Sequence, residues 1–171
     1  MKNMMMVIFL AMQSAFAASP PQEVISACLL GSDFQAVHFL EIASSESYEY
    51  EEKLRGFTRS FMIKSPIDKN EVGFASGKQE AALVFGEAIY PLRKAVRLDA
   101  KTDDPYVFFP ALAQWATVKN ARHNYLCVRF NFDGIGRSGT FQNTFGIYLL
   151  SKTKPRVLYY AVGDVRNLEA K

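Results

Sequence analysis

The stretch that most resembles a chemical motif is FNFDGIGRSGTFQNTFG, residues 130–146, in which Gly134, Gly136 and Gly139 have the spacing G-x-G-x-x-G. In dinucleotide-binding proteins these glycines join a strand to a helix, and the N-terminus of the helix faces the pyrophosphate. The residues after Gly139 are rich in Phe and Thr, which favours a second strand over a helix. The pattern therefore predicts a glycine-rich hairpin loop, and no dinucleotide cofactor is expected.

Two other short motifs fail at a position that their chemistry requires. GFASGK (73–78) is one residue shorter than a phosphate-binding P-loop, and Gln79 replaces the hydroxyl that would bind magnesium. GRSGT (136–140) has Thr140 where the second glycine of a nucleophile elbow is needed. Neither stretch therefore predicts a phosphate site or a serine nucleophile.

The two histidines, His38 and His123, are the candidate general bases. His123 could activate Ser138 or Cys127, which would make the protein a small exported hydrolase. No spacing supports either pair, and His38 lies among apolar residues with no nearby set of metal ligands. We therefore predict no catalytic residue, no cofactor and no metal ligand, and we keep the hydrolase as the alternative hypothesis.

The first residues have the features of a secretory signal peptide. A positive charge precedes an apolar run over residues 4–12, and Ala15 and Ala17 form the small-x-small pattern that a signal peptidase accepts. The run is too short to cross a bilayer, which needs about 20 apolar residues. We predict a signal peptide over 1–17 and a single exported α+β domain over 18–171, periplasmic or secreted, without a transmembrane segment.

The chain has two cysteines, Cys28 and Cys127. In an oxidising compartment such a pair predicts a disulfide. Residues 25–28, Ile-Ser-Ala-Cys, also resemble the cleavage box of a lipoprotein, but a polar segment separates them from the apolar run. A lipid anchor at Cys28 is therefore the weaker interpretation.

Hydrophobic periodicity and turn residues predict the elements before the last third of the chain. A Ser-Pro start and a Gly stop favour a helix over 20–30, and alternation around Gly56 favours a hairpin within 48–63. A capping-box pattern before an apolar run predicts a helix over 77–90. The segments 34–43 and 111–121 fit either a helix or a strand.

The last third predicts three strands, over 125–132, 141–150 and 157–162, joined as an antiparallel meander. The predicted fold class is α+β, with N-terminal and central helices packed on a mainly antiparallel β-sheet that ends in this three-strand meander.

Charge is divided unevenly along the chain. Residues 119–171 contain nine Lys and Arg against three Asp and Glu, whereas residues 18–118 contain ten against fourteen. The basic part favours an anionic partner, such as an acidic protein or an envelope polymer, or it packs beside the acidic part. Export and a formal net charge of only +3 argue against nucleic acid.

By elimination, the sequence favours an exported, non-enzymatic binding protein, such as an envelope inhibitor or immunity-type protein that acts on a protein partner. A structural envelope component is a further alternative. The candidate binding residues are Arg137 and Ser138 in the glycine-rich loop, and Tyr48 and Tyr50 as aromatic anchors in the acidic run 45–53. Oligomeric state is not predicted.

Overall fold

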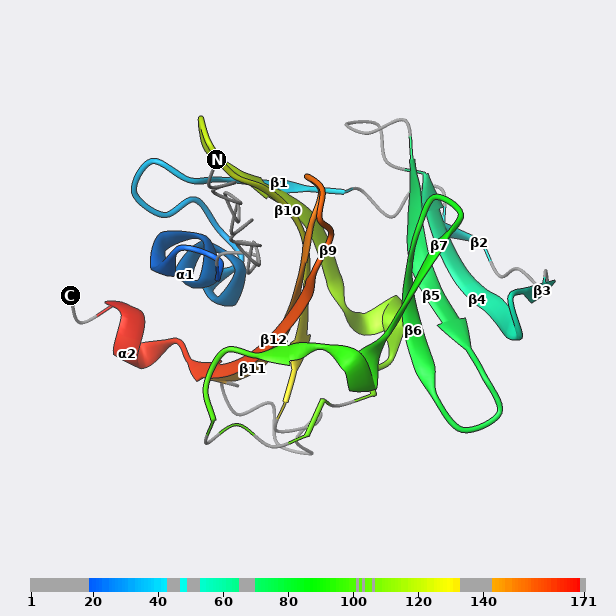
Figure 1. Ribbon diagram of the computed structural model, residues 1–171. Coiled ribbons are helices and arrows are strands. Elements are labelled where there is room, and N and C mark those ends of the chain that lie inside the picture. The colour runs from blue at the N-terminus through cyan, green and yellow to red at the C-terminus, as the bar shows by residue number, and fades with distance from the viewer. Residues whose placement is uncertain are drawn as a thin grey trace, which may run out of the picture.

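The chain folds into two β-sheets packed face to face, with a short helix on the outer face of one sheet (Figure 1). The computed structural model describes residues 19–42, 47–48, 53–64, 70–100, 102, 104–105, 107–132 and 143–169.

The first sheet has the spatial order β1-β9-β10-β11-β12-β8. Its strands are β1 (His38–Glu41), β9 (Gln114–Lys119), β10 (Asn124–Asn131), β11 (Thr144–Ser151), β12 (Leu158–Asp164) and β8 (Val96–Arg97). Neighbouring strands are antiparallel, except that β8 is parallel to β12. Most residues of β10 and β11 are buried on both faces, as expected for central strands that are covered on each side.

The second sheet has the order β2-β4-β5-β6-β7, with β3 paired to one end of β4. Its strands are β2 (Ser47–Tyr48), β3 (Lys53–Leu54), β4 (Phe57–Lys64), β5 (Glu71–Ser76), β6 (Ala81–Phe85) and β7 (Ala88–Pro91). All its pairings are antiparallel. The β6–β7 turn contains Gly86 at φ 60°, a left-handed conformation that glycine adopts without strain.

Two apolar layers hold this arrangement together. The layer between the sheets combines Phe61, Phe74 and Leu83 of the second sheet with Leu126 and Tyr148 of the first. The other layer lies between the outer face of the first sheet and helix α1 (Gln22–Leu30), which contacts β9, β10 and β11. Alternate residues of each strand point to opposite faces, so a single strand such as β10 supplies both layers.

The predicted α+β class is wrong. Among the described residues, the fold is mostly β: two sheets are accompanied by only two short α-helices, α1 and α2 (Arg166–Glu169), and by single 3-10 turns. The N-terminal helix expected over 20–30 is present as α1, and the strands expected in the last third of the chain correspond to β10, β11 and β12.

The central helix expected over 77–90 does not form, because β6 and β7 occupy that segment. All five residues of β6 are buried, so the run has no exposed helical face. Of the capping-box residues, Ser76 ends β5, and Gln79 lies in the connection to β6, where the Gly77 N–H donates to the Glu80 carbonyl at 2.7 Å. The two ambiguous segments contain strands: β1 lies within 34–43 and β9 within 111–121.

Candidate protein-binding site

Residues 107–112, Val-Phe-Phe-Pro-Ala-Leu, form a loop that leads into β9 and closes one end of the space between the sheets. Its anchor is Phe108, which is 4% exposed. The Phe108 ring stacks on Phe130 of β10, with centroids 4.8 Å apart, and meets Phe74 of β5 edge-on at 5.3 Å. Phe108 therefore contacts both sheets, and such aromatic pairs add to the stabilisation from burial alone.

Polar contacts fix the rest of this apolar loop. The indole Nε1 of Trp115 donates to the Pro110 carbonyl at 2.9 Å, and Trp115 itself is buried. Residues Pro110–Leu112 form the 3-10 turn η3, in which the Leu112 N–H donates to the Phe109 carbonyl at 3.0 Å. The backbone conformation is therefore set by contacts within the chain.

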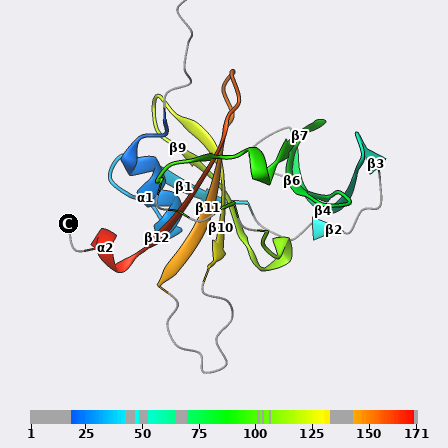
Figure 2. The ribbon, with the colours of Figure 1, turned by 60° about the horizontal axis from the view of Figure 1, so that its bottom comes forward.

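This support leaves three large apolar side chains exposed. Phe109 is 78% exposed, Leu112 64% and Val107 57%; the fourth exposed large hydrophobic residue among those described, Val96, lies in β8. Figure 2 shows η3 in yellow-green at the end of the sandwich, near β10 and the second sheet. Scattered apolar side chains are normal on a surface, but a cluster on a fixed protruding loop is typical of an interaction site.

The predicted disulfide between Cys28 and Cys127 is confirmed. It joins α1 to β10, with the two Cα atoms 5.9 Å apart and both residues completely buried. Cys127 therefore has no free thiol to act as a nucleophile, and the sulfur of Cys28 is not free to carry a lipid.

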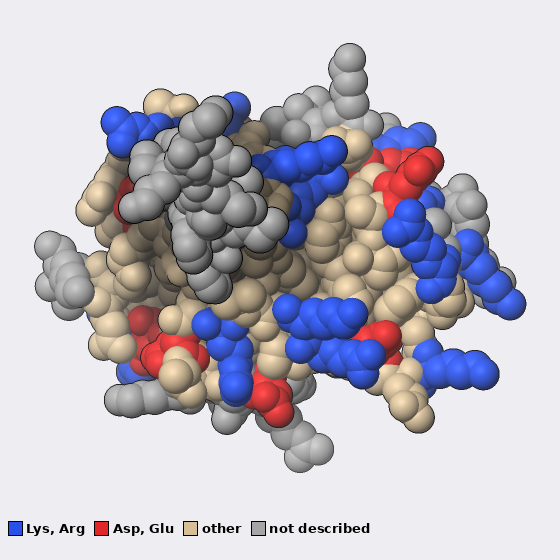
Figure 3. Space-filling view, in the orientation of Figure 1, with Lys and Arg blue, Asp and Glu red and all other residues tan. Residues whose placement is uncertain are grey.

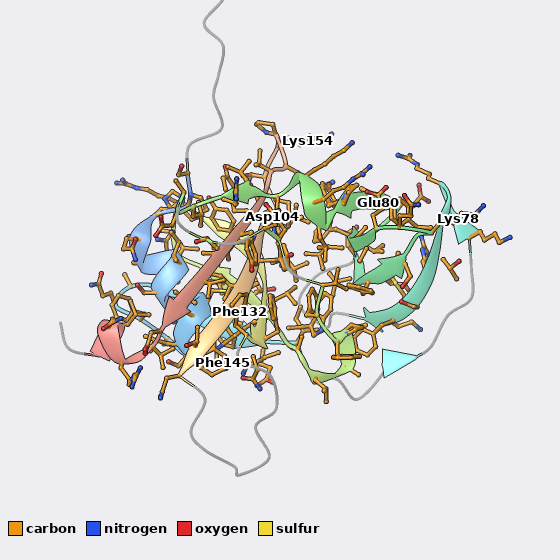
Figure 4. All side chains as sticks on the ribbon, turned by 90° about the horizontal axis from the view of Figure 1, so that it is seen from below. Lys78, Glu80, Asp104, Phe132, Phe145 and Lys154 are labelled. Carbon is orange, nitrogen blue, oxygen red and sulfur yellow. A yellow bond between two sulfur atoms is a disulfide. The ribbon has the colours of Figure 1, made fainter. Side chains whose placement is uncertain are left out.

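Arg129 of β10 supports the same helix. Its Nε donates to the Leu29 carbonyl at 2.7 Å, and its guanidinium carbon lies 3.4 Å from the centroid of the Phe145 ring; Figure 4 shows Phe145 on β11. Burial lowers the pKa of Arg129 to about 10, so the side chain stays charged at neutral pH. A cation at the C-terminus of α1 complements the helix dipole, which gives this residue of the basic C-terminal part a structural role.

Three of the four predicted binding residues, Arg137, Ser138 and Tyr50, lie outside the described residues. Tyr48 lies in β2, the edge strand of the second sheet, opposite Met62 of β4. Of the four predicted binding residues, the structure thus describes the backbone position of Tyr48.

The histidines lie in different surroundings. His38 is exposed and its Nδ1 is 3.1 Å from the Asp33 carboxylate, which also accepts a hydrogen bond from the Phe39 N–H. Those hydrogen bonds lower the pKa of Asp33. His123 lies in the β9–β10 turn, where its backbone N–H donates to the Asn120 side chain at 2.8 Å.

Within the described ranges, no three His, Cys, Asp or Glu residues are grouped so that they could hold a metal ion.

No protein-family model matches the chain, and no curated protein or solved structure matches it either. None of the helices in the described part of the chain has the length and apolar character needed to span a bilayer. The functional conclusion therefore depends on the site itself.

Sequence reasoning missed Phe109 and Leu112. The only local signal is a proline inside a short apolar run, VFFPAL, which argues against a regular central strand. That signal does not indicate which phenylalanine is buried.

Proposed function

We propose that the protein is a non-enzymatic binding protein that engages a protein partner through the apolar loop. The observation that carries this proposal is the exposure of Phe109 and Leu112 on a loop that Phe108 and Trp115 hold in place. Large apolar and aromatic side chains provide most of the binding energy in protein interfaces when they fill a pocket of the partner. A loop that is already ordered loses little further conformational entropy on binding.

The shape of the loop favours an inhibitor or immunity-type protein as the kind of binding protein. The exposed side chains protrude from the end of the sandwich, so the matching pocket belongs to the partner. A protein that inserts a fixed loop into another protein can block that partner without any chemistry of its own.

The proposed compartment is outside the cytoplasm, periplasmic or secreted. The signal-peptide features of residues 1–17 motivate this assignment. The Cys28–Cys127 disulfide supports it, because such bonds persist in oxidising compartments.

Arg137 and Ser138 are proposed as additional contacts to the same partner. The described residues that flank their segment, Phe132 and Asn143, lie at the end of the first sheet where β9 begins; Arg129 of β10 pairs there with Gln114. Arginine suits such a contact, because its planar guanidinium can bind a carboxylate through two hydrogen bonds. Tyr48 of β2, and Tyr50, remain proposed as contacts at a second place.

The test uses the mature chain, residues 18–171, as bait in extracts of the envelope and secreted fractions of its source cells. A partner captured by the wild type is purified and its affinity measured by calorimetry. Phe109→Ser should weaken binding by about 1–3 kcal/mol, the range of an interface anchor. Arg137→Ala should weaken binding in the same range if the glycine-rich loop contributes.

Val96→Ser is the matched control, since it also removes an exposed apolar side chain, 48% exposed, but from β8. Its affinity should equal that of the wild type. Equal affinities of Phe109→Ser and wild type for a verified partner would overturn the proposed site.

A further inference from the structure

A second surface lies at the opposite end of the first sheet, around Arg156. It comprises two adjoining open hollows of about 570 and 450 Å³, both lined by Arg156. The first is also lined by Tyr90, Lys154 and Pro155, and the second by Arg55, Asn70, Phe85, Gly86, Glu87 and Ala88. This Arg156 cleft is thus formed between the loop that joins β11 to β12 and the turns of the second sheet.

The guanidinium group of Arg156 is held against an aromatic ring, and one of its donors lacks a partner among the described residues. It lies over the ring of Phe85, 4.9 Å from the centroid, and its Nε is buried without a hydrogen-bond partner in the described part of the chain. By contrast, Arg93, Arg97 and Arg166 each lie within salt-bridge distance of a carboxylate. A buried donor without a partner costs free energy, so an unpaired group of this kind calls for an explanation.

The charges around the cleft favour an anion. Lys154 and Arg55 add two positive charges to that of Arg156, and among the described lining residues Glu87 is the one acidic side chain. Figure 3 shows Lys and Arg side chains gathered over the loop that joins β11 to β12. Cations that line a hollow concentrate the electrostatic field there and attract anions.

The other side chains that line the cleft favour a ligand that contains a ring. Tyr90 and Pro155 present flat apolar groups beside Lys154 and Arg156. The hollows have the size of ordinary small-ligand sites, which are roughly 300–1,000 Å³. A sugar ring can pack an apolar face on an aromatic ring while its charged substituent reaches a cation.

We propose that the Arg156 cleft binds a sugar that carries a carboxylate or a phosphate group. The anionic group accepts hydrogen bonds from the guanidinium of Arg156 and is attracted by Lys154, and the sugar ring packs against Tyr90. The planar donor geometry of arginine suits both kinds of anion. This site is independent of the apolar loop: Tyr125 of β10 pairs with Ser151 next to the cleft, whereas Arg129 pairs with Gln114 at the other end.

The test is an NMR titration of the mature chain with glucuronate, glucose 6-phosphate and neutral glucose. At least one of the two acids should bind saturably and shift resonances of the cleft residues, and glucose should bind at least tenfold more weakly. Binding of only one acid identifies the anionic group. Arg156→Gln and Lys154→Gln should each weaken the binding of that acid at least tenfold.

Lys78→Gln is the matched control for Lys154→Gln, because it removes the same charge from an exposed lysine in the β5–β6 turn. Figure 4 shows Lys78 and Lys154 at separate places on the molecule. The control should bind as the wild type does. If Arg156→Gln does not fold, as judged by its thermal transition, the exposed Lys154 provides the decisive variant.

Three results would overturn the proposal: saturable binding of neither acid, equal binding of glucose, or the same loss in Lys78→Gln as in Lys154→Gln. Tetraglutamate is the fourth ligand of the titration. Binding of this peptide as tight as that of the sugar acids would overturn the assignment to sugars and identify an acidic-peptide site.

Discussion

Arg129 is half-buried and makes several kinds of contact with α1 and its surroundings. Its Nε donates to the Leu29 carbonyl, its Nη1 lies 3.5 Å from Gln114 Oε1, and its guanidinium covers Phe145. Gly31, which ends the helix at φ 70°, leaves room for it: a Cβ there would lie 3.3 Å from the Arg129 side chain. One side chain thus connects a helix end to two strands.

Arg129→Gln should lower the free energy of unfolding by about 1–3 kcal/mol, because it removes a charge-assisted hydrogen bond and a cation–π contact. Urea denaturation monitored by circular dichroism measures the change. Arg122→Gln, at an exposed position of the β9–β10 turn, should change it by less than about 0.5 kcal/mol. Equal stabilities of the two variants would contradict the role of Arg129 described above.

The adjacent residues Phe108 and Phe109 should respond to truncation in opposite ways. Phe108→Ala opens a cavity between the sheets and should lower the free energy of unfolding by about 3–5 kcal/mol. Phe109→Ala removes a side chain that is 78% exposed, so its effect should stay within about 0.5 kcal/mol. Thermal and urea denaturation of the two variants measure these changes. Similar losses of unfolding free energy in both would show that Phe109 also supports the fold.

At the scale of elements, the disulfide fastens α1 onto strands that are distant in sequence. Its cysteines are separated by 99 positions, and closing a loop of that length removes much of the entropy of the unfolded chain. The double variant Cys28→Ala/Cys127→Ala should therefore lose roughly 4–5 kcal/mol of unfolding free energy. Guanidinium denaturation of the variant and of the oxidised wild type measures it. A loss below about 1 kcal/mol would show that packing alone holds α1.

The elements that sequence patterns could predict are those with one clear periodicity. The alternation of Leu126, Val128 and Phe130 indicated β10, because each of these faces the second sheet. Ala81–Phe85 has no such alternation: it is buried on both faces, and an uninterrupted apolar run fits a helix or a strand equally well. The segment becomes a strand because it pairs with β5 and β7. A local sequence pattern carries no information about those pairings.

The two proposed binding surfaces could not be predicted from the sequence for a related reason. Exposure of Phe109 depends on Phe108 filling the space between the sheets, and the cleft around Arg156 depends on turns of the second sheet that lie far away in the chain. The disulfide could be predicted because a chain with two cysteines has only one possible pairing between them.

For the whole molecule, buried tyrosines make stability sensitive to alkaline pH. Burial raises the pKa of Tyr125, Tyr148 and Tyr159 above the ordinary value of about 10. Their stabilising contribution is complete below about pH 10 and is lost at higher pH, because the unfolded chain releases these protons first. Burial lowers the pKa of Arg129 to about 10, so its titration makes the free energy of unfolding rise with pH. This single group is outweighed by the three tyrosines.

The free energy of unfolding should therefore fall as the pH rises above about 10. Urea denaturation across that range measures the decrease, and tyrosinate absorbance should report ionisation of the buried rings only as the protein unfolds. In Tyr148→Phe the decrease with pH should be shallower. A stability that stays constant across this range would contradict the expected linkage.

The proposed export predicts a defined mature end. The small-x-small pattern at Ala15 and Ala17 predicts cleavage after Ala17, so a secreted chain should begin at Ala18. Intact-mass analysis of protein recovered outside the cytoplasm tests this. A mass that includes residues 1–17, or a lipid-modified chain that begins at Cys28, would contradict it.

The long separation of the bonded cysteines also sets an order of events during synthesis. Cys28 leaves the ribosome 99 residues ahead of Cys127, which corresponds to roughly 5–20 s at ordinary elongation rates. For most of that interval α1 has no β9, β10 or β11 to cover, and the thiol of Cys28 can react with other nascent chains. Cys127, in contrast, emerges when its partner is already waiting. Mispaired dimers linked through Cys28 are therefore the characteristic by-product expected when this chain is made faster than it can be oxidised.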